Sequence, residues 1–426
     1  MRNLDKFKGC LVGGAAGDAL GYAVEFMSEG AISASYGPGG ITRYANGRGL
    51  ISDDTQMSMF TAAGLLLGAE RYKSGGFAGY PYYIALSYGD WYGTQTAEFP
   101  LKRSYVPLAK MPEMFSRRAP GKTSLSALSH FLESHEYGTI EHRINHSKGC
   151  GGVMRAAPVG LFFAGSAVPV WESDMIAAES AALTHGHGLG WLPAALLAHI
   201  VRLLTEDAGE TILHAVEDAA KTLAGLFPDI RHTNQMLARL KKAVDLAANL
   251  EYDDLSAIHK LGEGWVGDEA LAVAVFCALR HSDDIEAALI AAVNHAGDSD
   301  STGAICGNIM GASFGYDAIP DPFKTNLELH DTLCSLAAQL CDAEVPADSR
   351  AVKNDKADGM ETLPCATCRF RTIVTLPDGT ALDSGRGSTC AAYPDLKPLD
   401  VMSDCAHCPK YDREQETAAK NDFHSR

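Results

Sequence analysis

The sequence predicts an all-α domain of many helices, followed by a small β module that a metal ion holds together. Three observations support this fold class. Between residues 5 and 343, Ala and Leu recur at i, i+3 and i+4, the spacing of a helix face that packs on a core. Alternating strand patterns are nearly absent from this part. Five of the eleven cysteines lie between Cys365 and Cys408, on either side of a short strand-like segment.

The composition limits which classes of protein are possible. Of the 426 residues, 46% are apolar and 21% are charged, which excludes global disorder and fibrous repeats. The formal net charge of −17 repels phosphate backbones and argues against nucleic acid as the main partner. Asp18 interrupts the N-terminal apolar stretch, and no uninterrupted apolar run reaches the roughly 18 residues of a membrane span. We therefore expect a cytoplasmic protein without a membrane segment.

Helical periodicity is clearest after residue 170. The segments that carry it are 174–185, 190–205, 210–226, 233–249, 268–281, 283–296 and 328–342. Pro and Gly punctuate the joints between them, as at Phe227-Pro228. Residues 74–145 are rich in Tyr, Gly and Ser with few clean periods, so we expect one or two helices and long loops there. Residues 1–343 are predicted to form one catalytic domain.

The chain changes character after residue 343. Residues 344–362 are polar with almost no large apolar side chains, which predicts a linker. Residues 363–411 form the predicted module, in which a Pro-Asp-Gly turn favours a β-hairpin. Residues 412–426 are charged and are predicted to be a flexible tail.

Paired cysteines flank the predicted hairpin. Two C-x-x-C pairs have the spacing of a tetrahedral Zn²⁺ site, and about fifty residues make too small a core to fold unaided. The predicted zinc ligands are Cys365, Cys368, Cys405 and Cys408, with Cys390 as the alternative. An iron–sulfur cluster is the rival interpretation. The module is also a candidate contact for a protein partner.

The first acidic motif is Ser52-Asp53-Asp54-Thr55, directly before a helical segment. Two adjacent carboxylates with hydroxyls on both sides supply the hard oxygen ligands that Mg²⁺ or Mn²⁺ selects. Ser at an N-cap with Asp in the first turn is equally ordinary in a helix without any metal. This motif alone does not decide between the two interpretations.

A second acidic motif places Asp298, Asp300 and Ser301 before another helix. A solvated acidic loop that caps this helix is the structural alternative. However, glycines recur every four residues from Gly303 to Gly315, which indicates a helix in close contact with another backbone. Buried carboxylates beside such packing are costly unless a cation compensates them. Two such clusters in one chain favour a shared dinuclear site.

Two further segments are candidates for chemistry. The opening helix carries small residues on nearly every face, and Glu25 follows its end, where the helix dipole disfavours a carboxylate. A residue in a locally unfavourable position is a candidate for a functional role. A Gly-rich loop at 149–152 has free N–H groups that can hold a pyrophosphate, although such turns are common.

Taken in order, these segments resemble the ADP-ribosylglycohydrolase family over roughly residues 5–343. The family's G-D-A-L-G with a following Glu corresponds to Gly17–Gly21 and Glu25, and its T-D-D-T corresponds to Ser52–Thr55. Its G-N-G-x-x-M-R stands at 149–155 with Cys150 in place of Asn.

Three further family motifs complete the resemblance. A P-G-N-T loop stands at 120–123 with Lys in place of Asn, a T-H pair stands at 184–185, and G-D-x-D-T stands at 297–301 with Ser301 in place of Thr. The stretch GDALGYAVEFMS looks particularly like the branch that removes ADP-ribose from arginine in dinitrogenase reductase.

The resemblance implies an all-α orthogonal bundle with two Mg²⁺ or Mn²⁺ ions at one end of a cleft. The implied metal ligands are Ser52, Asp53, Asp54, Asp298, Asp300 and Ser301. The implied substrate-binding residues are Gly121, Ser147, Gly149, Gly151, Gly152 and His185, although a histidine like His185 is often only structural. The residues expected to be catalytic are Glu25, Asp53 and Asp300, with Glu25 handling the proton or holding a substrate hydroxyl.

The implied activity is metal-dependent hydrolysis of the N-glycosidic bond between ADP-ribose and a protein side chain, with arginine expected first. One alternative is a hydrolase of other ADP-ribose linkages, on serine, nucleic acid or small conjugates. Another is a protein that binds ADP-ribosylated targets or neutralises a transferase. Two acidic clusters together with Glu25 favour an enzyme, because binding alone would not need all of them.

Overall fold

The computed structural model describes residues 2–74, 79–228 and 230–346, together with 373–375 and 381–383. The chain divides into two compact units, of which the first comprises residues 1–70, 79–133 and 137–349. The helices along the chain are α1 (Leu4–Gly21), α2 (Glu29–Tyr36), α3 (Asp53–Lys73), α4 (Tyr80–Thr96), α5 (Lys122–Ser134), α6 (Ala157–Phe163), α7 (Val170–Ala182), α8 (Gly188–Glu206), α9 (Ile212–Leu226), α10 (Thr233–Ala248), α11 (Asp254–Leu261), α12 (Gly267–Arg280), α13 (Ile285–Val293), α14 (Ser299–Phe314), α15 (Asp321–Lys324) and α16 (His330–Asp342).

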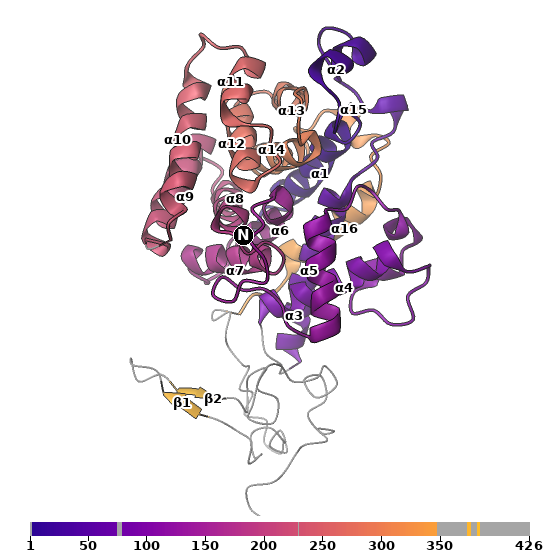
Figure 1. Cartoon of the computed structure of the whole chain (residues 1–426), viewed down its shortest axis with the longest axis vertical. Coiled ribbons are helices and arrows are strands. Elements are labelled where there is room, and N and C mark those ends of the chain that lie inside the picture. The colour runs from indigo at the N-terminus through magenta and orange to yellow at the C-terminus, as the bar shows by residue number, and fades with distance from the viewer. Residues whose placement is uncertain (1, 75–78, 229, 347–372, 376–380, 384–426) are drawn as a thin grey trace, which may run out of the picture. The chain divides into compact units, whose positions relative to one another are not determined.

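The first unit is helical, as the sequence predicts (Figure 1). Each segment with clear periodicity after residue 170 forms a helix whose ends differ from the prediction by a few residues. The region 74–145 contains α4 and α5 between loops and short 3₁₀ turns, which was also expected. The short helices α2 and α11 are not among the predicted segments, because eight residues carry too few turns to show a period.

Near the C-terminus, the structure describes two short strands, β1 (Ile373–Thr375) and β2 (Ala381–Asp383). They pair antiparallel, with Val374 opposite Leu382. The residues that join them and the five cysteines of the predicted module lie outside the described residues. The zinc site, with its ligands Cys365, Cys368, Cys405 and Cys408 or the alternative Cys390, therefore stays a prediction.

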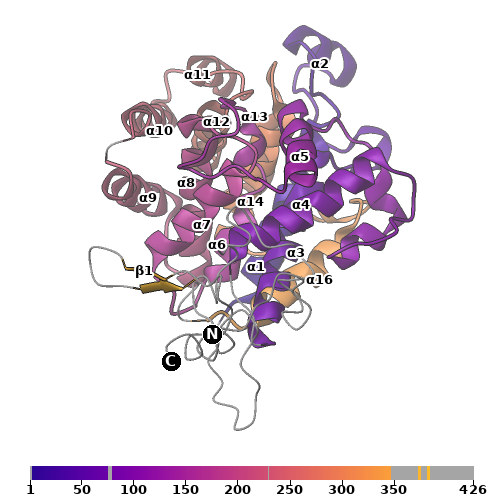
Figure 2. The same ribbon diagram turned by 60° about the horizontal axis from the view of Figure 1, so that its bottom comes forward.

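The helix pair α1 and α14 forms the centre of the first unit (Figures 1 and 2). Every residue of α1 from Gly9 to Gly21 is buried, although glycine disfavours a helix. Gly9, Gly13, Gly17 and Gly21 of α1 lie against Gly311, Gly307, Gly303 and Ser299 of α14, and a Cβ on any of these glycines would overlap the backbone of the other helix. The periodic glycines of α14 thus meet the small-residue helix at the start of the chain.

Helix α8 is the most apolar long helix among the described residues. By length and composition alone it is long and apolar enough to cross a membrane, but 94% of its most apolar stretch is buried inside the protein. His199 and Arg202 interrupt its apolar sequence, which is why no uninterrupted run of this length stands out. Figure 2 shows α8 between α7 and the outer helices α9 and α10, where burial explains its composition.

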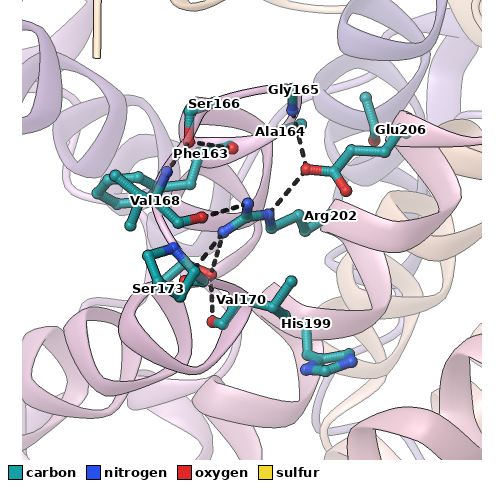
Figure 3. A network of polar contacts seen from close by, with 12 residues as sticks. Phe163, Ala164, Gly165, Ser166, Val168, Val170, Ser173, His199, Arg202 and Glu206 are labelled. Atoms are coloured by element: carbon teal, nitrogen blue, oxygen red, sulfur yellow. Dashed lines mark hydrogen bonds and ion pairs between the residues drawn. The ribbon is translucent and has the colours of Figure 1, made fainter. Parts of the chain in front are cut away.

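Arg202 of α8 fixes the loop between α6 and α7 (Figure 3). Its guanidinium donates to the carbonyl of Val168 at 2.7 Å and to the Ser173 hydroxyl at 3.0 Å. Its Nε donates to Glu206 at 2.9 Å, and the same carboxylate accepts from the Gly165 amide. Because Arg202 is buried, these bonds satisfy a charge that would otherwise be costly.

His199, one turn before Arg202, connects three helices. Its Nδ1 lies 2.8 Å from buried Asp174 of α7, and its Nε2 lies 3.1 Å from Asp218 of α9. Burial acts to lower the pKa of His199, but the two carboxylates outweigh it and leave the pKa raised. The protonated imidazole therefore stabilises the fold below the unfolded pKa of about 6.5, and this contribution is lost as pH rises through the folded pKa.

We expect His199→Gln to lower the free energy of unfolding by about 1.5–3 kcal/mol at pH 6, the range for hydrogen bonds to charged groups. At pH 9 the difference between wild type and variant should be smaller, because wild-type His199 is then less protonated. Urea denaturation of both proteins at the two pH values measures this. An equal difference at both would mean that His199 is neutral in the folded protein.

Candidate active site

The central helix pair brings both acidic motifs to one end of the bundle. α1 ends four residues before Glu25, α14 begins directly after Asp298, and α3 begins with Asp53 and Asp54. The charge of Asp300 acts on both Asp53 and Asp54, so the two motifs lie together. This convergence is the condition on which a shared site depends.

Asp18 joins α1 to the first acidic motif. Its buried carboxylate accepts hydrogen bonds from the Ser52 amide at 3.0 and 3.1 Å and from the Thr55 amide at 3.1 Å, and the Thr55 hydroxyl also donates to it. Asp18 therefore holds the start of α3 in position. No role for Asp18 is predicted from the sequence, although an ionisable side chain within a buried helix of small residues needs buried partners.

Asp53 and Asp54 face different neighbours at the start of α3. Asp53 accepts a hydrogen bond from the Gly121 amide at 3.2 Å, so the loop at 120–123 is tied to the acidic motif. The Asp54 amide donates to the Ser52 hydroxyl at 3.1 Å, as in ordinary helix capping. Oδ2 of Asp54 is buried and has no hydrogen-bond partner. Capping therefore explains Ser52 but not the two buried carboxylates.

The second acidic motif is buried rather than solvated. Asp298 occupies the N-cap position of α14, yet its side chain makes no capping hydrogen bond. One carboxylate oxygen from each of Glu25, Asp298 and Asp300 lies within 4.8 Å of the other two. Ser301 lies in the same first turn and its hydroxyl is 3.9 Å from the Met154 sulfur. The solvated-loop alternative for this motif is therefore wrong, because Asp298, Asp300 and Ser301 are all buried.

Burial and mutual repulsion dominate the electrostatics. Burial, followed by the charge of Asp300, raises the pKa of Asp18 to about 7 and that of Glu25 to about 10. The same two causes raise the pKa values of Asp53, Asp54 and Asp298 well above the ordinary range. Six carboxyl groups concentrated in this way repel one another unless positive charge is present.

The arrangement fits divalent cations. Oε2 of Glu25 and Oδ2 of Asp54 are buried without hydrogen-bond partners, and such atoms are expensive to leave unsatisfied. Their neighbours are carboxylate and hydroxyl oxygens, the ligands that Mg²⁺ and Mn²⁺ prefer. The residues predicted as ligands thus form a cluster whose oxygen atoms suit Mg²⁺ or Mn²⁺.

The predicted substrate loop lies beside this cluster. Ser147 accepts a hydrogen bond from the Gly149 amide at 3.3 Å, and its hydroxyl is 3.2 Å from that of Thr123. The ring of His185 lies against Gly149 and Gly151. Gly152 has a different role, because a Cβ there would overlap the backbone of Gly190 in α8.

His185 is held by a buried chain of contacts. The Arg155 guanidinium lies 4.3 Å from the Tyr88 ring centre and donates to Thr184 Oγ1 at 2.6 Å. That hydroxyl is 2.8 Å from Nδ1 of His185. Burial, with the charge of Arg155, lowers the pKa of His185 to about 3, so the imidazole is neutral at physiological pH. It can offer the substrate loop a hydrogen bond but no charge.

Cys150 belongs to this loop, and its side chain interacts with Asp298 of the acidic cluster. Burial and the carboxylates of Asp298 and Asp54 raise the pKa of its thiol well above the usual range. It therefore stays protonated, and it has no amide with which to replace the family's Asn.

Comparison with known proteins identifies the family. A family model described as ADP-ribosylglycohydrolase matches residues 1–349. The ADP-ribosyl-[dinitrogen reductase] glycohydrolase of Rhodospirillum rubrum is 26% identical over 331 residues, which cover 76% of this chain and 91% of that protein. Human ADP-ribosylhydrolase ARH3 is 27% identical over 218 residues, which cover 46% of this chain and 58% of that protein.

A solved structure supports the fold. It is described as an ADP-ribosylglycohydrolase-related protein complex and aligns with a TM-score of 0.53 at 24% identity, covering 80% of this chain and 99% of that one. The family model spans all the site residues named above except the predicted zinc ligands. The chain belongs to the ADP-ribosylglycohydrolase family and is a glycosidic-bond hydrolase that acts on ADP-ribose linkages.

Proposed function

We propose that this enzyme hydrolyses the N-glycosidic bond between ADP-ribose and an arginine side chain of a protein, with two Mg²⁺ or Mn²⁺ ions as cofactors. The observation that carries the proposal is that two buried acidic motifs meet beside Glu25, where Oε2 of Glu25 and Oδ2 of Asp54 have no hydrogen-bond partner. The arginine linkage is supported by similarity to the dinitrogen reductase glycohydrolase along most of both chains.

Asp53, Asp54, Asp298 and Asp300, with the hydroxyls of Ser52 and Ser301, would hold the two ions. When bound, the ions supply Lewis-acid chemistry at the ribose hydroxyls and the attacking water. Ser147 and the loop Gly149–Gly151 would face the diphosphate or distal ribose. The hydrogen bond from the Gly121 amide to Asp53 would hold the separate loop at 120–123 against the acidic cluster.

Glu25 is proposed to handle the proton. Cleavage at C1″ of the ribose passes through an oxocarbenium-like state, in which water adds as the C1″–N bond breaks. Water must lose one proton, and the departing guanidine nitrogen must gain one. A carboxylate at the position of Glu25, beside Asp298 and Asp300, can accept the first and return the second.

The test is release of ADP-ribose from peptides that carry it on arginine or on serine, and from a thymidine-linked conjugate. We expect release from the arginine peptide with Mg²⁺ or Mn²⁺ and none in excess EDTA, with activity restored by adding the metal back. Release only from serine or thymidine linkages would contradict the arginine assignment and identify a different leaving group. Tight binding of every substrate without release would favour a binding protein instead.

A further inference from the structure

Two aromatic side chains stack on each other at the surface next to Glu25. Phe26 and Trp265 have ring centres 5.5 Å apart and ring planes inclined by 18°. The side chains are not hidden by this contact, since Phe26 is 72% exposed and Trp265 is 38% exposed. An exposed pair of large apolar rings forgoes the stabilisation of burial, and exposed apolar surface of this kind is typical of binding sites.

The backbone holds Phe26 outward at some cost. Its φ of +65° lies in the left-handed region, which bulky residues rarely adopt. The turn that follows α1 enforces this conformation, because the amides of Val24 and Glu25 both donate to the Gly21 carbonyl and the Met27 amide donates to Val24. Strain of this kind persists where surrounding structure imposes it and is common at ligand contacts.

The pair borders three parts of the active site at once. Phe26 directly follows Glu25. Gly264, the neighbour of Trp265, lies so close to Asp298 that a Cβ on it would be 3.3 Å from the Asp298 Cβ. The Trp265 carbonyl accepts a hydrogen bond from the Cys150 amide at 3.3 Å. A group that leaves the acidic cluster on this side therefore meets the two rings.

The charge around the Phe26–Trp265 pair indicates which kind of substrate group the pair would receive. Glu25, Asp18 and the four aspartates of the two motifs gather six carboxyl groups next to Phe26, which directly follows Glu25. The surroundings of the pair therefore favour a cation. A guanidinium is planar, weakly hydrated and well suited to lie on an aromatic face, which distinguishes it from a serine hydroxyl or an ammonium.

We propose that Phe26 and Trp265 form a platform that receives the guanidinium group of the ADP-ribosylated arginine and so selects this linkage over others. The inference rests on the proposed function, because it concerns the leaving group of the same reaction. The rings make no bond to the reacting atoms. They position the leaving group by cation–π contact while Glu25 remains next to C1″.

Trp265→Ala is the main test, with Trp265→Tyr as the conservative variant and Trp171→Ala as the matched control. Trp171 is 46% exposed on α7 and lies outside the site. A cation–π contact of about 1–2 kcal/mol corresponds to a roughly 5- to 30-fold loss in kcat/KM on the arginine-linked peptide, mainly through KM. Trp265→Tyr should retain most of the activity, and Trp171→Ala should match wild type.

The ratio of kcat/KM on arginine-linked to serine-linked peptide is the decisive quantity. It should fall in Trp265→Ala and in Phe26→Ala. If both substrates lose equally, the rings contact the ADP-ribose itself, for example by stacking on adenine, and the proposal is wrong. An unchanged ratio with unchanged rates would also overturn it.

Failure of the proposed function gives a separate result. If wild-type enzyme with Mg²⁺ leaves the arginine-linked peptide intact, the arginine assignment fails. The same dye-labelled peptide can then be titrated, without turnover, with wild type and Trp265→Ala in a fluorescence anisotropy assay. Weaker binding by the variant would support the platform, and equal binding would overturn it.

Discussion

Asp300→Asn is expected to reduce hydrolysis of ADP-ribose linkages on the order of 10³-fold, because several kcal/mol of transition-state stabilisation depend on a correctly loaded metal site. Asp300 is the residue whose charge acts on the carboxyl groups of both acidic motifs. It also lies within 4.8 Å of Glu25 and Asp298, measured between carboxylate oxygens. No other carboxylate is as central to the cluster.

Stability gives a second readout that separates this role from a folding defect. Without metal, Asp300 repels its neighbours, so Asp300→Asn should melt at the same temperature as wild type or higher in EDTA. Added Mg²⁺ or Mn²⁺ should raise the melting temperature of wild type, since ligands stabilise the state that binds them, and should raise that of the variant much less.

Asp245→Asn is the matched control for Asp300→Asn. Asp245 is exposed on α10 and, among the described residues, forms an ion pair with Lys241 one turn away, which contributes little to stability. This variant should resemble wild type in activity and in its response to metal. Full activity of Asp300→Asn, or full activity of wild type in excess EDTA, would contradict the metal assignment.

The fold could be predicted largely because its long helices carry a period. α8, α9 and α12 repeat their apolar residues over several turns, and the sequence pattern locates them closely. The pairing of α1 with α14 could not be predicted from the sequence. Glycines every four residues indicate close packing, but a residue without a side chain does not specify its partner. Only the three-dimensional structure identifies α1 as that partner.

The site, too, could be predicted only in part. Motifs rich in carboxylates stand out in the sequence, so Asp53, Asp54, Asp298 and Asp300 are found there. Asp18 has no such neighbours along the chain, and its role depends on α3 folding back against α1. The Phe26–Trp265 pair joins residues distant in sequence, and exposure of an aromatic ring cannot be predicted from its identity. Contacts between distant segments are thus the part that the sequence leaves open.

The close contact of α1 and α14 leads to the second large expected effect. Gly307→Val should lower the free energy of unfolding by about 3 kcal/mol, at the upper end of the usual cost of overpacking. The new side chain would meet the backbone of Gly13, which has no freedom to move aside within a buried helix. The intrinsic helix propensity of Val is no worse than that of Gly, so the loss arises from packing.

Gly30→Val makes the same substitution where space is available. Gly30 lies in α2, and a Cβ there meets nothing within 4 Å. Urea denaturation should therefore show a much smaller change for Gly30→Val than for Gly307→Val. Because α1 leads to Glu25 and α14 begins beside Asp298, separating the helices should also weaken metal-induced stabilisation in Gly307→Val. If the two variants unfold alike and respond equally to metal, the α1–α14 contact does not hold the acidic cluster together.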